Sequence, residues 1–302
     1  MHNKVMYLFL LAAIVSTTVS AFELRQYKSA GIVILYEPPL ENAAKKLAGE
    51  YPEIRADVEK KLQWSIGFTP TVVLIREHKE FQEKARDNLV TAFAVPGENV
   101  IMIDYSRMGR TPFDLRATLA HEICHLVLHY YISDSVPRWL DEGVAQWTSG
   151  GISDILVPDE KDILKQAILS GGLLRLKDIS LRFPEEPEKL LLSYEESKAF
   201  VEFIVRGYGT AKLITVLHSL KKSESVEQAV YENLSTGMDQ LEQKWREGLV
   251  RKYSWPSYIA DHIYGIIFFA AALATLIGYV MFRRRMKSLR DDENDDFPDE
   301  KR

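Results

Sequence analysis

The sequence predicts an α+β fold, in which a small N-terminal β-sheet with helices precedes a helical lobe and one C-terminal transmembrane helix. Short apolar, β-branched runs are concentrated before residue 106, whereas the chain from Pro112 onward has helical spacing almost throughout. A third observation concerns residues 263–282, an uncharged apolar run of 20 residues. That length is what a helix needs to cross the hydrocarbon core of a bilayer.

The first half of the chain predicts a small sheet interleaved with helices. The apolar runs predict strands over 30–36, 71–75, 89–95 and 100–105. Helical spacing predicts helices over 40–64, with a possible break at Pro52, and over 77–85. The turn-forming residues of 96–99 (Pro-Gly-Glu-Asn) separate the last two strands and therefore predict a hairpin.

The second half predicts helices only. Thr111 is the expected cap and Pro112 the first-turn residue of a helix that runs to about Tyr131. Pro137 opens a second helix, which runs to about Ser149. Further helices are expected at 159–169, 194–206, 210–220, 225–233 and 238–253.

The two ends of the chain predict its domain organisation. Lys4, the apolar residues 5–15, and Val19 with Ala21 before a cleavage site indicate a signal peptide at 1–21, with an uncleaved anchor as the alternative. A single domain is expected over 22–258, followed by a transmembrane helix at 259–282 and a tail at 283–302. Arg283 and its basic neighbours predict a cytoplasmic tail, which leaves the domain in the periplasm or outside the cell.

Composition narrows the class of protein further. The chain has 302 residues, of which 46% are hydrophobic and 27% charged, so a folded domain is expected rather than a disordered chain. Its net charge of −5 argues against nucleic acid as a partner. Cys124 is the only cysteine, which excludes an intramolecular disulfide. The oligomeric state is left open.

The residues that carry chemistry begin with His121-Glu122-Ile123-Cys124-His125, an HExxH motif within a predicted helix. Residues at i and i+4 share one helical face, so both imidazoles can reach one ion, a spacing that suits tetrahedral zinc. Glu122 can accept a proton from a metal-bound water. Two surface histidines are the alternative, but the apolar residues around the motif favour burial.

A third ligand is available on the next predicted helix, in the segment Trp-Leu-Asp-Glu-Gly-Val-Ala at 139–145. A tight connection between the two helices would bring Glu142 against the histidines. Asp141 is expected to point elsewhere, about 100° round the helix. His129 and Gln146, one turn beyond His125 and Glu142, are expected to support the site or the fold. Cys124 is expected to be a small buried hydrophobe.

HExxH followed by W-L-x-E-G-x-A resembles the gluzincin metallopeptidases of the peptidase MA-like kind, whose aminopeptidases carry a similar W-L-N-E-G-F-A block. The segment 194–200, Tyr208-Gly209 and Trp245 extend the resemblance, which covers roughly residues 89–253. It implies a zincin-like domain with one zinc ion per chain. The expected zinc ligands are His121, His125 and Glu142, with Glu122 as general base and Tyr194 as the candidate that stabilises the oxyanion.

The resemblance bears on two further segments. Gly97-Glu98-Asn99 could be a remnant of an amine-binding block, although a hairpin turn explains the same residues. The strand at 100–105 is implied to be a sheet edge beside the cleft, able to pair with a peptide, or else an ordinary covered strand.

The resulting hypothesis is a membrane-anchored zinc metallopeptidase acting on a peptide or protein substrate outside the cytoplasm. The alternative is a non-catalytic zinc-containing domain of the cell envelope that binds peptides or partner proteins. Glu122 favours catalysis, because a structural zinc site has no use for a general base. A metal hydrolase acting on a non-peptide amide is a third reading that the sequence leaves open.

Overall fold

The computed structural model describes residues 24–85, 90–109, 113–132, 136–150, 163–222, 225–253 and 255–295. The predicted signal peptide at 1–21 and the expected cap at Thr111 and Pro112 lie outside the described residues. The described chain divides into two units between Trp245 and Arg246. Each unit is considered by itself.

A five-stranded mixed sheet forms the N-terminal part of the first unit, and its strand order is β1-β2-β3-β5-β4. The central strands β2, β3 and β5 are parallel, whereas the outer strands β1 and β4 pair antiparallel with their neighbours. Thr71 pairs with Val100, which in turn pairs with Val95. The strands are β1 (Arg25–Ser29), β2 (Ile32–Tyr36), β3 (Thr71–Ile75), β4 (Ala92–Val95) and β5 (Val100–Asp104).

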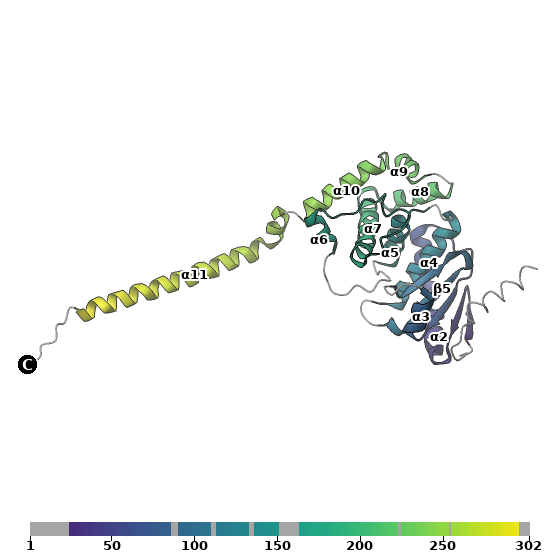
Figure 1. Ribbon diagram of the computed structural model, residues 1–302, viewed down its shortest axis with the longest axis horizontal. Helices are drawn as coiled ribbons and strands as arrows, with labels where there is room; N and C mark the ends of the chain where they lie inside the picture. Colours follow the sequence, from purple (N-terminus) through teal and green to yellow (C-terminus); the bar gives the residue numbers. More distant parts are fainter. Residues whose placement is uncertain are drawn as a thin grey trace, which may run out of the picture. The chain divides into compact units, whose positions relative to one another are not determined.

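The rest of the described chain is mostly helical, so the predicted α+β class is confirmed. In Figure 1 the sheet with α2 and α3 occupies one part of the unit, and α4 lies between it and α5, α7 and α8. The helices are α2 (Glu41–Leu62), α3 (His78–Ala85), α4 (Leu115–Ile132), α5 (Arg138–Ser149), α6 (Ile163–Ser170), α7 (Pro187–Tyr208), α8 (Thr210–Lys221), α9 (Val226–Leu234) and α10 (Met238–Lys252).

The sheet differs from the sequence prediction at both edges. Strand β1 was not expected, because its residues are polar and mostly exposed and so lack the apolar alternation of a half-buried strand. The expectation that 100–105 forms an edge is wrong, since β5 lies between β3 and β4. The predicted hairpin is confirmed and explains this, because it folds β4 back along the outer side of β5.

Two helix starts also differ from the prediction. Helix α4 begins at Leu115, where the Asp114 carboxylate accepts a hydrogen bond from the Ala117 amide at 2.9 Å. Helix α7 begins at Pro187, so Tyr194 lies about two turns inside it. Pro52 does not break α2.

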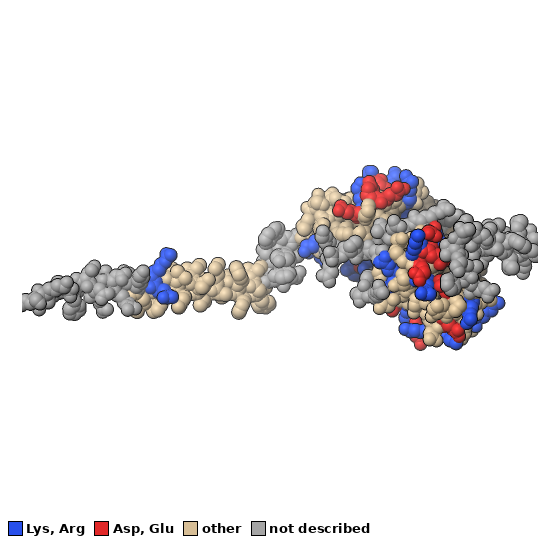
Figure 2. All heavy atoms as spheres, turned by 60° about the horizontal axis from the view of Figure 1, so that its bottom comes forward, with Lys and Arg blue, Asp and Glu red and all other residues tan. Residues whose placement is uncertain are grey.

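The second unit contains helix α11 (Trp255–Asp295). Within it, residues 263–286 form the one helical segment in the described part of the chain that is long and apolar enough to cross a membrane. Its side chains are solvent-exposed throughout, and Figure 2 shows an uncharged stretch that ends in basic side chains. These are Arg283, Arg284 and Arg285. The domain boundaries at 21/22, 258/259 and 282/283 stay predictions.

Candidate metal centre

The HExxH motif lies in the middle of α4, a helix that is apolar on nearly every side because the sheet, α2 and α5 surround it. His121 and Glu122 are each only 1% exposed. The His125 side chain keeps 11% of its surface exposed. This burial rules out two histidines on a polar surface, the alternative that the sequence allowed.

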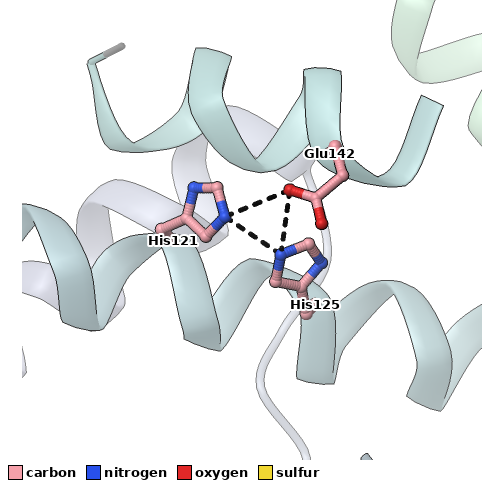
Figure 3. A group of neighbouring side chains, drawn as sticks. All are labelled: His121, His125 and Glu142. Carbon is pink, nitrogen blue, oxygen red and sulfur yellow. Dashed lines mark hydrogen bonds and ion pairs between the residues drawn. The ribbon is translucent and has the colours of Figure 1, made fainter. Parts of the chain in front are cut away.

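Three donor atoms converge between α4 and α5, as Figure 3 shows. The Nε2 atoms of His121 and His125 are 3.0 Å apart. Oε2 of Glu142 lies 3.5 Å from Nε2 of His121 and 3.7 Å from Nε2 of His125. The i, i+4 spacing therefore acts as expected, and the packing of α5 against α4 brings Glu142 to the same point.

These separations suit a zinc ion. Tetrahedral zinc with nitrogen and oxygen ligands at normal bond lengths puts its donor atoms about 3.3 Å apart. The three distances lie on either side of that value, and two imidazoles with one carboxylate form a donor set that catalytic zinc uses. The residues present thus fit the metal that the motif implies.

Asp141 supports the ring of His125 from the opposite side. Its Oδ1 lies 2.8 Å from Nδ1 of His125, so this carboxylate accepts a hydrogen bond from Nδ1–H and leaves the Nε2 lone pair facing the other donors. As expected, Asp141 does not contribute to the donor triangle. The sequence analysis did not predict its contact with the far side of the His125 ring. The available signal in the sequence was an acidic residue next to a predicted metal ligand, because a ligating histidine needs a hydrogen-bond partner for its second ring nitrogen.

Arg138 was also missed by the sequence analysis. Its Nη2 lies 2.6 Å from Oε1 of Glu142, and its Nη1 lies 3.5 Å from Oδ2 of Asp141. The i, i+4 spacing of Arg138 and Glu142 on one helix was the signal that could have found it.

Electrostatics in this cluster favour charged groups despite their burial. Burial opposes ionisation of Glu142, but Arg138 and His125 outweigh it and hold the pKa of that carboxyl well below its usual range. Burial likewise disfavours a charged His125, yet Asp141 and Glu142 raise its pKa to about 9.

Helix α5 is held against α7 at the level of the ligands. A Cβ on Gly143 would collide with the Ser197 carbonyl oxygen and approach Val201 Cγ2 to 2.6 Å, so only glycine lets the two helices approach this closely. One turn further, Nε2 of the buried Gln146 donates to the Tyr194 carbonyl at 3.1 Å. In the Glu-Gly pair of the motif, Glu142 thus supplies a metal-facing oxygen, and Gly143 allows the close approach of α5 and α7.

A pocket of about 330 Å³ opens beside the donor triangle. Glu122, His125, Glu142 and Tyr194 all line it, whereas His121 lies behind them. Residues of the edge strand β4 and the following Pro96 also line the pocket. The structure therefore brings the five residues predicted for the site together, four of them at one pocket.

The remaining candidates have simpler roles. Cys124 is fully buried, where its Sγ lies 3.7 Å from Oγ1 of Thr148, and burial raises the pKa of its thiol. His129 lines the pocket without joining the donor triangle. Gly97 and Glu98 belong to a tight turn that Asn99 closes with a φ of 53°, so the turn explanation of this segment accounts for it.

The model of the peptidase MA superfamily matches residues 87–251. A search of curated proteins finds no match.

Among solved structures, a two-domain M1 zinc metallopeptidase mutant bound to L-arginine has a TM-score of 0.45 and 14% identity. A mutant M1 zinc metallopeptidase from Deinococcus radiodurans, bound to a Tyr-Ser-Ala substrate, has a TM-score of 0.44 and 16% identity. Each alignment covers 76% of this chain and 51% of the other, so the chain spans about half the length of these structures.

Proposed function

The chain belongs to the peptidase MA superfamily, and we propose from this premise that it is a membrane-anchored zinc metallopeptidase that hydrolyses peptide bonds. One observation carries the proposal. The donor atoms of His121, His125 and Glu142 converge at a pocket that Glu122 and Tyr194 also line. These three ligands would hold one zinc ion per chain.

Bound there, zinc supplies a Lewis acid that polarises the scissile carbonyl and makes a water more acidic. Glu122 would take the proton of the attacking water and deliver it to the leaving amine. Its burial at the pocket wall, next to the donor triangle but outside it, supports this role.

The Tyr194 hydroxyl would donate a hydrogen bond to the oxyanion of the tetrahedral intermediate. Its side chain lines the pocket from α7, and the Gln146 amide holds its backbone. Packing together with its interaction with the Arg138 guanidinium is the competing explanation for a tyrosine that is only 8% exposed.

The peptide would lie along β4. This strand is the sheet edge beside the pocket, and an extended peptide can add to such an edge through main-chain hydrogen bonds. This role, first expected for the strand at 100–105, passes to β4 with the observed strand order.

For the membrane, we propose that the domain at 22–258 lies outside the cytoplasm, that 259–282 spans the bilayer and that 283–302 stays inside. The exposed apolar stretch and the basic residues after it support this topology. A reporter enzyme fused after residue 302 is expected to lie in the cytoplasm, so its activity should be found on that side of the membrane. Activity outside the cell membrane would reverse the proposed orientation.

The test of the function uses the full chain in detergent, with metal analysis and cleavage of a peptide library. Wild type is expected to hold about one zinc and to cleave peptides, whereas Glu122→Gln keeps the zinc and loses cleavage. Glu77→Gln, at an exposed glutamate, is the matched control.

Three results would contradict the proposal in different ways. Zinc without cleavage of any peptide would favour the binding domain of the cell envelope. Hydrolysis confined to non-peptide amides would replace the substrate class. A wild-type chain that binds no zinc would refute the metal site itself.

A further inference from the structure

Arg138 divides the two oxygens of Glu142 between two tasks. The guanidinium Nη2 lies 2.6 Å from Oε1, whereas Oε2 is the oxygen that faces the two imidazole nitrogens. Because Oε1 is paired with the Arg138 guanidinium, the carboxylate offers only Oε2 to the space between the histidines.

The guanidinium is fixed from outside α5 by the segment 171–186, which connects α6 to α7. The Phe183 ring lies under it, with 5.7 Å between the ring centroid and Cζ of Arg138, and packs edge-on against the Tyr194 ring. The Arg138 amide also donates to the Ser180 carbonyl at 2.7 Å. The segment is itself held by Glu196, whose carboxylate accepts from the Leu174 amide at 2.9 Å.

We propose that Arg138 is a positioning residue that restricts Glu142 to a single metal-facing oxygen. The inference rests on the metal site of the proposed function and adds how that site keeps room for water. A catalytic zinc ion needs an open position, and a second oxygen from Glu142 would occupy it. The planar fork of arginine suits this task, because it can hold Oε1 while its other nitrogen faces Asp141.

The experiment replaces zinc with Co²⁺ in the full chain, because the visible absorption of Co²⁺ weakens as its coordination number rises. Arg138→Met removes the partner of Oε1 and is expected to keep one metal ion while its absorption weakens. Its peptidase kcat should fall about 10- to 100-fold, the usual effect of losing a residue that orients a ligand. Arg138→Lys keeps a donor near Oε1 and is expected to retain most of the absorption.

Arg116→Met is the matched control. Arg116 also bridges two carboxylates, those of Glu53 and Asp57, each at 3.0 Å, but both of these belong to α2 and not to the metal site. Its loss should leave the Co²⁺ spectrum and kcat unchanged.

An unchanged spectrum in Arg138→Met would overturn the inference. Loss of metal from a folded Arg138→Met chain would also overturn it, because Arg138 would then stabilise the site as a whole. If that variant does not fold, Arg138→Gln takes its place with the same expected weakening and the same contrary result. A wild type that binds Co²⁺ but cleaves nothing would refute the peptidase function and still leave the spectral comparison decisive.

Discussion

The two walls of the pocket are built by different rules. The wall formed by α4 and α5 is buried and charged, and it contains the ion pairs of Arg138 with Glu142 and of His125 with Asp141. Apart from Tyr194, the rest of the lining, here called the apolar wall, comes from β4 and the residues on either side of it, from Leu128 of α4, from Val136 before α5 and from the segment 171–186. Its members are Val90, Ala92, Phe93, Ala94, Pro96, Leu128, Val136 and Leu181.

This difference indicates that the groups suited to catalysis and the surface suited to binding peptide side chains lie in separate parts of the pocket. Charges in the buried wall are oriented by helices that cannot shift without breaking several contacts, which suits groups that must act on one atom. The apolar wall lacks charged side chains among its members and is open at its edge strand, which suits variable side chains of a peptide.

The largest effect is expected within the buried wall, from two of its three carboxylates. Glu122→Gln should lower turnover by about 10²- to 10⁴-fold, the usual contribution of a general base, with zinc content nearly intact. Glu142→Ala should instead lose metal, because it removes a donor atom. Zinc analysis and peptide cleavage on both variants test this division. Equal metal loss in both would contradict it.

A smaller effect is expected from the residue behind His125. Asp141→Asn removes the negative charge that accepts the hydrogen bond from Nδ1–H of His125, and zinc affinity should fall about 10- to 100-fold. Competition with a chelator of known affinity measures the change. Asp178→Asn, at an exposed carboxylate that pairs with Arg175, is the control and should bind zinc as wild type does. Equal affinities for all three chains would show that Asp141 does not support the site.

The packing of the buried wall is tested by Gly143→Ala. The new Cβ would press on the α7 backbone at Ser197, so the free energy of unfolding should fall by about 1–3 kcal/mol. Denaturant titration of the full chain measures it. Gly49→Ala on α2, where a Cβ meets nothing within 4 Å, should leave the chain as stable or slightly more so. A Gly143→Ala chain as stable as wild type would show that α5 and α7 can separate freely.

The smallest effect is expected in the apolar wall. Leu181 is 96% exposed at the rim of the pocket, so Leu181→Ser should leave stability unchanged and reduce the preference for apolar peptide residues by about 10-fold at most. Ratios of kcat/KM for paired peptides measure this. Leu169→Ser, at another exposed leucine that is not among the pocket residues, is the control. The same selectivity in both variants would remove Leu181 from substrate recognition.

The buried wall was far easier to predict from sequence than the apolar one. Helical spacing alone brings His121 and His125 to one face, and a short connection returns Glu142, so local geometry determines the donor triangle. The contacts of Asp141 and Arg138 depend on which ring nitrogen and which carboxylate oxygen face across two helices. The i, i+4 spacing of Arg138 and Glu142 allows the two side chains to pair but does not determine which of their atoms meet.

The sheet shows the same limit on a larger scale. The apolar run of β3 predicted its bounds of 71–75 correctly, because both neighbours bury it. The polar edge strand β1 carries no such signal, since its pairing with β2 rests on backbone hydrogen bonds that any side chain permits. The position of β5 inside the sheet follows from non-local pairing, which the turn between β4 and β5 restricts but does not determine.

The burial of Cys124 has a consequence for redox chemistry. The thiolate is the form that oxidants and disulfides attack, and burial disfavours that form here. The only thiol of the chain lies on α4 and is fully buried, so it cannot form a disulfide with a second copy unless the packing around α4 opens. In an oxidising compartment, the folded domain would therefore keep its cysteine reduced without help from a reductase.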